Sequence, residues 1–418
     1  MAVDYDPYSH EVMRDPHPVY ARLRAESPVH YLAKYDCWAL ARFADVWAAT
    51  LDAASFSARG GTAPGQVLRR DPAPHTFMTM DLPEHRVHRA LISGRYGRRA
   101  VARLEPRVRE VAHELLAGVA GELDVYAWAN RAAIWLGAEL LGLERDDAEQ
   151  LRGWIDDFFE RAPGQAGPGP ENFASAGRVS ERLAQLVAAR RAAPRAGDDH
   201  LTAWLSARIE GRALTDEEIV ANLYSMLVVA TETVPAAVAN TAALLAAHPD
   251  ALARVLAEPS WIPAAWAETL RVDQPTNLLG RRAIRDVAIG GEQIRTGQGV
   301  LLLWASANRD EAEFPGAARF DLDRRPARSL SFGHGIHKCL GEHLANLEGR
   351  VLLTELLART GKFAVDWRRA ERRYGEFLCG YRQLPILFGA AAHSRRSAGS
   401  RPARRARNSG GPETNPAG

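Results

Sequence analysis

The sequence predicts a mainly α-helical protein with small β-sheets at one side of the helical body. Between residues 101 and 248 the apolar residues recur at helical spacing with hardly a strand-like stretch, whereas after Pro263 short apolar runs lie between glycine-rich turns. The chain has 418 residues, 46% of them hydrophobic, so it can bury a large core. No linker interrupts it before the C-terminus, and we expect one folded domain over residues 1–389.

The C-terminal 29 residues, 390–418, have a different composition from the rest of the chain. They contain six arginines and one acid, Glu413, among Ser, Gly, Pro and Ala, with almost no apolar residue larger than alanine. Such a composition cannot bury enough apolar surface to offset the entropy of ordering, so we expect a disordered tail. The formal net charge of +2 gives no indication of nucleic-acid binding.

Neither the cysteines nor the N-terminus indicates an export route. The three cysteines form no C-x-x-C pair, which argues against a disulfide framework and for a reducing compartment. The N-terminus lacks a basic region followed by an apolar one, and no window approaches about 18 consecutive apolar residues. We therefore expect a cytoplasmic protein without a membrane span.

The N-terminal part mixes short helices with a β-ribbon. We expect a helix over Asp15–Glu26, two strands over Val29–Leu32 and Cys37–Ala41, and a helix over Phe43–Leu51. The stretch Phe56–Pro74 is rich in Gly, Pro and Arg and is predicted to be a loop. Asp81 and Pro83 then mark the start of a helix in which His85 and Arg89, four residues apart, share one face.

Long helices make up the middle of the chain, and strands return towards its end. Helical periodicity covers Val101–Leu116, Val125–Gly142, Asp146–Arg161, Asn172–Ala193, Asp198–Glu210, Asp216–His248 and Trp266–Val272. Short strands are predicted within Ala283–Ile294 and Val300–Trp304, and a closing hairpin over Phe377–Phe388.

The stretch Ser331–Gly341, S-F-G-H-G-I-H-K-C-L-G, is the centre of the functional prediction. Cys339 lies where a glycine-punctuated loop meets a helical pattern, and a sulfur near a helix N-terminus is favoured as thiolate. A rigidly held thiolate suits a soft metal or a haem iron. Two alternatives stay open from these residues alone: a buried packing thiol, and a zinc site that uses the neighbouring histidines His334, His337 and His343.

Four separated segments resemble the cytochrome P450 family in its soluble bacterial form. Phe332–Gly341 is similar to that family's cysteine loop F-G-x-G-x-H-x-C-x-G, and Glu268–Arg271 to its E-x-x-R motif. P-E-H-R-V-H-R, which begins at Pro83, and A-T-E-T, which ends at Thr233, are the other two. The resemblance covers about residues 8 to 388. It implies the P450 fold, a triangular prism of helices with a minor β-rich region.

The resemblance implies haem b, iron protoporphyrin IX, as the cofactor. Cys339 would be its proximal thiolate ligand, with Phe332 beside the sulfur and Gly341 closing the motif. The two haem propionates need cationic or hydrogen-bonding partners. The family's propionate ligands match four residues of this chain: His85, Arg89, Arg281 and His337. Glu268, Arg271 and Arg324 would form a buried structural network.

Glu232 and Thr233 match the acid–alcohol pair of the family, which delivers protons during dioxygen activation. The alternative for Thr233 is a mid-helix threonine that bonds its own backbone. This chain departs from the family by having Ala230 in place of a glycine and Pro235 two residues after the threonine. Pro235 has no N–H for the carbonyl of Thr231, so we expect a kink that opens the groove where dioxygen binds.

The resemblance implies a monooxygenase that uses O2 to hydroxylate or epoxidise an apolar small molecule, such as a natural-product intermediate. The chain has neither a dinucleotide-binding glycine motif nor an iron–sulfur cysteine cluster, so a separate ferredoxin and ferredoxin reductase are implied. The alternatives are a peroxide-dependent peroxygenase and a non-catalytic haem-binding protein. Apolar pocket residues are expected from several segments: Met78, Met80, Phe158, Phe159, Met226, Val229, Leu278 and Leu279.

Overall fold

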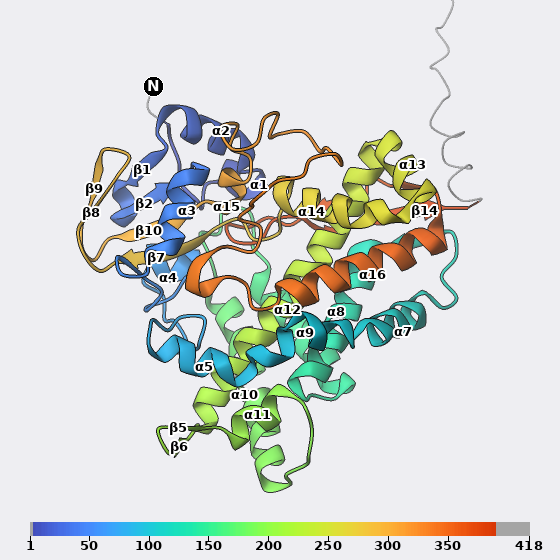
Figure 1. Cartoon of the computed structure of the whole chain (residues 1–418), viewed down its shortest axis with the longest axis horizontal. Coiled ribbons are helices and arrows are strands. Elements are labelled where there is room, and N and C mark those ends of the chain that lie inside the picture. The colour runs from blue at the N-terminus through green and yellow to red at the C-terminus, as the bar shows by residue number, and fades with distance from the viewer. Residues whose placement is uncertain (1–2, 390–418) are drawn as a thin grey trace, which may run out of the picture.

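The computed structural model describes residues 3–389. It consists of a helical body and, at one side, a β-rich region to which the N-terminal strands belong. Figure 1 shows the sheet of β1, β2, β7 and β10 at one side and the long helices at the other. The predicted mainly α class with small sheets is therefore confirmed. The predicted disordered tail, residues 390–418, lies outside the described residues.

The helices account for most of the chain. Their bounds are α1 His10–Arg14, α2 His17–Glu26, α3 Phe43–Leu51, α4 Pro64–Leu68, α5 Glu84–Ser93, α6 Arg98–Ala102, α7 Glu105–Leu116, α8 Val125–Leu141, α9 Arg145–Phe159, α10 Pro170–Ala192, α11 His200–Ser206, α12 Asp216–Ala247, α13 Pro249–Ala257, α14 Ile262–Val272, α15 Trp304–Ala307 and α16 Glu342–Thr360. Short 3₁₀ turns lie at Ala33–Tyr35, Gly94–Tyr96, Pro259–Trp261 and Gly335–His337.

The strands are short. Their bounds are β1 Val29–Leu32, β2 Cys37–Leu40, β3 Phe56–Ser57, β4 Glu122–Asp124, β5 Arg208–Ile209, β6 Arg212–Ala213, β7 Leu279–Ala283, β8 Val287–Ile289, β9 Glu292–Ile294, β10 Gly299–Leu302, β11 Phe363–Val365, β12 Glu371–Arg372, β13 Tyr381–Gln383 and β14 Pro385–Phe388. The largest sheet has the order β1-β2-β10-β7-β3, with β10 parallel to β2 and the other neighbours antiparallel.

Two predicted segments differ from the structure in kind. The hairpin over Phe377–Phe388 is wrong, because β13 pairs with β12 while β14 lies between β11 and β4. Only Leu384 separates β13 from β14, which is too short for a hairpin turn. The predicted loop Phe56–Pro74 contains β3 and α4; Pro64 begins α4, and Gln66 Oε1 accepts hydrogen bonds from two preceding N–H groups.

Two predicted helices are also shorter than expected. The stretch Val101–Leu116 is divided between α6 and α7, and Pro106 occupies the first turn of α7. The stretch Asp198–Glu210 forms α11 only over His200–Ser206, after which β5 and β6 form a two-stranded ribbon around Glu210 and Gly211.

α12 is the central element of the helical body. Thr215 and Glu218 form a reciprocal capping box at its N-terminus, and the helix is continuous through Pro235. Its flanks pack against α8, α10, α14 and α16. Among residues 3–389, α12 alone is long and apolar enough to cross a membrane, but 72% of its apolar window is buried inside the protein, as in a core helix.

The predicted Glu268–Arg271–Arg324 network is present. Arg271, 0% exposed, donates to both carboxylate oxygens of Glu268 at 2.8 and 2.7 Å, and Arg324 Nε donates to Glu268 Oε1 at 3.0 Å. Arg271 Nη1 also donates to two backbone carbonyls, those of Asn308 and Ala317. Because these acceptors satisfy a buried charge, the network fixes the segment that leads to the cysteine loop.

Candidate active site

The cysteine loop is shaped by two glycines and one backbone hydrogen bond. Gly333 and Gly335 have φ of 63° and 72°, in the left-handed region that glycine adopts without strain. A Cβ on Gly335 would collide with the carbonyl oxygen of Thr50, so this loop can pack against α3 only with glycine there. Cys339 N–H donates to Phe332 O at 2.9 Å and closes the loop just before α16.

Cys339 is open on one side and enclosed by protein on the others. Its side chain is exposed, unlike buried Cys37, because it faces a cavity. The surrounding protein atoms keep water from most of the sulfur, and this desolvation raises the pKa of the thiol. The N–H of Gly341 donates to the sulfur and opposes the rise. The N–H therefore stabilises negative charge on the sulfur, although burial has the larger effect in the protein alone.

The zinc alternative is not supported by the geometry of the loop. The ring of His334 stacks on Trp47 with centroids 3.8 Å apart, away from a shared ligand position. In residues 3–389 no group of three or more His, Cys, Asp or Glu side chains is placed to hold a metal ion.

One cavity of about 340 Å³ connects the cysteine loop with α12. Its wall contains eight of the nine predicted site residues: Arg89, Glu232, Thr233, Arg281, Phe332, His337, Cys339 and Gly341. The ninth, His85, lies next to the wall, since its ring centroid is 4.4 Å from that of His337. Residues from α5, α12, β7 and the loop before α16 thus meet around one space.

The cationic cluster of His85, Arg89, Arg281 and His337 has few partners among the described residues. Arg281 is only 6% exposed, and the acceptor of its guanidinium is the neighbouring carbonyl of Gly280. Burial lowers the pKa of Arg281 to about 10 and that of His337 to about 3. The Nε2 atoms of His85 and His337 are buried without hydrogen-bond partners in this part of the chain.

These unpartnered groups fit haem. Buried donors without acceptors are costly, and the two carboxylates of a porphyrin would supply acceptors and negative charge. The thiol of Cys339 faces the same cavity and provides the sulfur donor that a haem-thiolate requires. The donor set present therefore matches the cofactor that the resemblance implies.

Thr233 and Glu232 lie in the cavity wall, but both are engaged with other groups. Thr233 Oγ1 donates to Val229 O at 3.1 Å, the bond within its own helix that was the alternative for this residue. Glu232 Oε2 accepts from Arg373 Nη2 at 2.8 Å and from the hydroxyl of Tyr126 at 3.3 Å. Burial raises the pKa of Glu232 to about 7, against the opposing effect of Arg373.

Sequence reasoning missed Tyr126, Asp156 and Arg373, which surround Glu232. They lie on α8, on α9 and after β12, and no local motif marks them. A signal for Asn130 did exist. Since Pro235 leaves the carbonyl of Thr231 without its helical donor, a partner was required, and Asn130 Nδ2 donates to that carbonyl at 2.9 Å.

The apolar part of the cavity agrees with the prediction at five of eight positions: Met78, Phe159, Met226, Val229 and Leu279. Met80, Phe158 and Leu278 do not line it. Leu278 is buried in the N-terminal core and Met80 in the helical core, so their side chains fill the interior instead. Additional apolar lining comes from Phe77, Val228, Leu344, Phe377 and Leu378.

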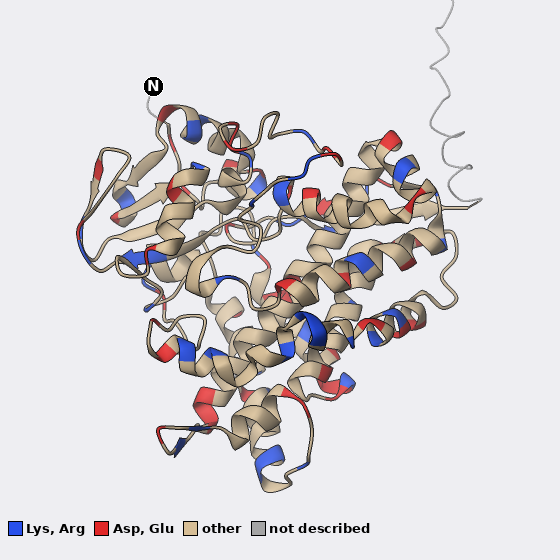
Figure 2. Ribbon diagram, viewed as in Figure 1, with Lys and Arg blue, Asp and Glu red and all other residues tan. Residues whose placement is uncertain are grey.

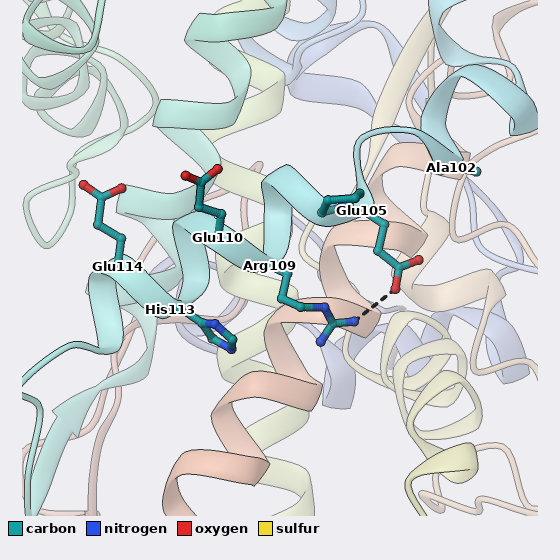
Figure 3. Close-up of a pocket in the computed structure, with 7 residues that line it drawn as sticks. Ala102, Glu105, Arg109, Glu110, His113 and Glu114 are labelled. Carbon is teal, nitrogen blue, oxygen red and sulfur yellow. Dashed lines mark hydrogen bonds and ion pairs between the residues drawn. The ribbon is translucent and has the colours of Figure 1, made fainter.

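A second hollow lies on the surface of α7 and contains none of the predicted site residues. It is lined by Ala102, Glu105, Pro106, Arg109, Glu110, His113 and Glu114. Arg109 Nη2 lies 3.0 Å from Glu105 Oε1, an ion pair that is drawn in Figure 3. Figure 2 shows acidic and basic residues alternating along α7. Its charges are paired with one another and with Glu355 of α16, which is typical of a solvated helix face.

Comparisons with known proteins point to one family. The cytochrome P450 family model matches residues 176–366. A putative cytochrome P450 123 of Mycobacterium tuberculosis is 33% identical over 391 residues, which cover 92% of this chain and 97% of that protein. The vitamin D(3) 25-hydroxylase of Pseudonocardia autotrophica is 34% identical, with 92% and 96% covered. A solved mutant of P450 EryK in complex with erythromycin B is similar with a TM-score of 0.83 and 31% identity, covering 90% of this chain and 98% of that one.

Proposed function

Since this chain belongs to the cytochrome P450 family of haem-b monooxygenases, we propose that Cys339 is its iron ligand and that it hydroxylates or epoxidises an apolar small molecule. One observation carries this proposal: the thiol, the acid–alcohol pair and three members of the cationic cluster line one cavity, and the cluster forms no ion pair with an acid among the described residues. When bound, haem supplies the oxidising chemistry that places one atom of dioxygen in the substrate and the other in water.

The residues of the chain would divide the work of binding. Cys339 holds the iron, and the Gly341 N–H stabilises charge on the sulfur. His85, Arg89, Arg281 and His337 would bind the propionates, and the Nε2 atoms of His85 and His337 have no other partner among the described residues. Glu232 and Thr233 supply and position protons on the substrate side.

An apolar substrate is supported by the cavity wall. Phe77, Met78, Phe159, Met226 and Phe377 offer apolar surface from four segments, and apart from Glu232 and Glu348 the charged residues of the wall belong to the proposed haem site. Related proteins named for vitamin D(3) hydroxylation or solved with erythromycin B support lipophilic natural products as the class. We also propose that the reaction takes place in the cytoplasm.

A separate ferredoxin with its reductase is the proposed electron donor. Arg98, Arg99 and Arg103 in or next to α6 are exposed and form no ion pair with the described residues. α6 packs against α16, the helix that follows Cys339, and Lys338 is exposed next to the ligand. A basic surface on this side would attract an acidic carrier and keep the electron path to the iron short.

A peroxide-dependent enzyme is the second candidate. It is favoured by the engagement of Thr233 with Val229 O and of Glu232 with Arg373, because neither group then donates into the cavity. A non-catalytic haem protein is the third candidate, from a different class of function.

Turnover under ¹⁸O2 separates these functions. The purified holoprotein is incubated with NADPH, a ferredoxin, its reductase and a panel of steroids and macrolides. We expect ¹⁸O in the product, with dependence on the ferredoxin. Product formed only with added hydrogen peroxide would favour the peroxygenase, and bound haem without turnover under either condition would favour a binding protein.

A further inference from the structure

We propose that the hydroxyl of Thr276 hydrogen-bonds an oxygen atom of the substrate, and that the substrate is a lipophilic alcohol or ketone. Thr276 lies in the segment between α14 and β7 and lines the cavity. The inference rests on the proposed monooxygenase function and adds to it the polar feature by which the cavity selects and orients the substrate.

The hydroxyl groups of the cavity wall divide into bonded and unbonded ones. Thr233 Oγ1 donates to Val229 O at 3.1 Å, and Ser331 Oγ donates to Leu270 O at 2.8 Å. The others form no hydrogen bond with the described residues: those of Thr62, Tyr96 and Thr276. A hydroxyl without a partner in the wall of a cavity is free both to donate to a ligand and to accept from it.

Two of the unbonded hydroxyls lie on the side of the proposed haem site. Thr62 O accepts a hydrogen bond of 2.7 Å from the N–H of Gly280, the residue before Arg281. Tyr96 ends a 3₁₀ turn that contacts α16, the helix that follows Cys339. Neither hydroxyl is therefore placed in the apolar part of the cavity.

Thr276 is surrounded by apolar wall residues. It pairs with Leu378 in an antiparallel β-bridge, and Leu378 and Phe377 both line the cavity. Pro275 and Leu279, on either side of it in the chain, line the cavity as well. A hydrogen bond among apolar side chains is stronger than one in water, and a polar group left unpaired there is costly. The hydroxyl of Thr276 therefore distinguishes ligands that carry an oxygen atom from those that do not.

The segment that carries Thr276 is fixed by hydrogen bonds on both sides of this residue. Cys379 N–H donates to Pro275 O at 2.7 Å, and Asn277 N–H donates to Phe377 O at 2.9 Å. Asn277 is 1% exposed, and its side chain forms further hydrogen bonds of 3.2 and 2.9 Å to two other segments. A polar group on so rigid a segment orients a ligand without the entropic cost of ordering the protein.

These observations define the class of substrate. The apolar wall supplies contact area for a lipophilic skeleton, and the one hydroxyl in that part of the wall binds either a hydroxyl or a carbonyl oxygen. Because this bond fixes one point of the substrate, it also determines which carbon atoms are held near the site of oxidation.

Thr276→Val tests the inference, because valine has nearly the same shape and lacks the hydroxyl. Thr276→Ser retains the hydroxyl, and Thr62→Val is the matched control, since it removes the other unbonded threonine hydroxyl of the wall. The probes are testosterone with its 3-deoxy and 17-deoxy analogues, and 1-dodecanol with dodecane. Dissociation constants are measured from the shift of the Soret band when each probe is titrated into the full-length holoprotein.

The quantity compared is the ratio of the dissociation constants of the deoxygenated and oxygenated members of a pair. In the wild type we expect a ratio of about three to ten for at least one pair, the range for one net hydrogen bond. We expect a ratio near one in Thr276→Val and a ratio near that of the wild type in both Thr276→Ser and Thr62→Val. A purely structural role of Thr276 would weaken both members equally and leave the ratio unchanged.

The second readout is the distribution of products from the oxygenated probe that shows the largest ratio. Loss of the bond to Thr276 leaves the substrate free to turn in the cavity, so Thr276→Val is expected to oxidise this probe at additional positions. Thr276→Ser is expected to retain the distribution of the wild type.

Three results would overturn the inference. They are a wild-type ratio near one for every pair or no spectral shift with any probe, an unchanged ratio in Thr276→Val, and an equal loss of the ratio in Thr62→Val. Failure of the proposed function is seen separately, as a wild-type protein without thiolate-ligated haem or without oxygen-dependent turnover. Failure of this inference leaves both of those wild-type properties intact.

Discussion

Replacement of Asn130 by leucine tests how the fold accommodates Pro235 in its central helix. Asn130 is buried on α8, and its Nδ2 is the donor to the Thr231 carbonyl that Pro235 leaves without a helical partner. Leucine has nearly the same shape and no donor, so it buries the carbonyl unsatisfied. We expect a loss of about 2 kcal/mol in the free energy of unfolding, within the range of about 1–3 kcal/mol for such a group.

The double-mutant cycle with Pro235→Ala makes the test specific. Alanine restores an N–H that can donate to the Thr231 carbonyl four residues earlier, so the same Asn130→Leu change is expected to cost less than about 1 kcal/mol in that background. Urea unfolding of the four holoproteins, followed by far-UV circular dichroism at constant haem occupancy, gives the coupling energy. An equal cost of Asn130→Leu in both backgrounds would refute the reasoning.

Three other predictions concern charge. Arg281→Gln is expected to speed haem transfer to apomyoglobin at least about tenfold, because a buried charge-assisted hydrogen bond to the haem is lost. Arg282→Gln is the control and should have little effect, because the guanidinium of Arg282 donates to Gly297 O on the exposed side. Equal transfer rates in the two variants would contradict the assignment. The pKa of Glu232 is raised from 4.5 to about 7 in the folded protein, so the stability that its protonated form contributes is complete below pH 4.5 and is lost as pH rises through 7. In urea titrations, the wild type should therefore lose about 3 kcal/mol of unfolding free energy between these two pH values relative to Glu232→Gln. Parallel pH curves for the two proteins would be evidence against a buried acid. Replacing both Arg99 and Arg103 by glutamate should slow reduction by a ferredoxin about tenfold at low salt and less at high salt in stopped-flow experiments; an unchanged rate would place the docking surface elsewhere.

Much of the helical body could be predicted from local sequence. The helix Phe43–Leu51 agrees with α3 at both ends, and the predicted long helices agree with α8, α9, α10 and α12 to within two residues at each end. These segments combine an apolar period with a clear start or stop, such as Asp124 and Gly142 at the two ends of α8. That most residues of the candidate haem site are worth considering together could also be inferred from the sequence, because they belong to compact motifs, and the structure brings them around one cavity.

Strand partners were less predictable. The apolar run Pro385–Phe388 has strand character in any pairing, and its true neighbours, β4 and β11, are supplied by distant segments. Local sequence indicates that a strand exists but not which strand lies beside it, since pairing depends on the tertiary arrangement.

The surroundings of Glu232 were not predictable for the same reason. Asp156 and Arg373 are ordinary charged residues in the sequence, and an exposed ion pair would have been the natural interpretation of each. They come close to Glu232 only when α8, α9 and α12 pack together and exclude water from the carboxyl. The sequence identified the acid, whereas the structure shows what holds it.

The absorption spectrum of the dithionite-reduced protein with carbon monoxide, for wild type and Cys339→Ala, tests the central claim most directly. Thiolate ligation by Cys339 predicts a strongly red-shifted Soret band that is absent from the variant, even when the variant retains haem through the cationic cluster. The same red-shifted band in Cys339→Ala, or no such band in the wild type, would contradict the assignment of Cys339 as the iron ligand.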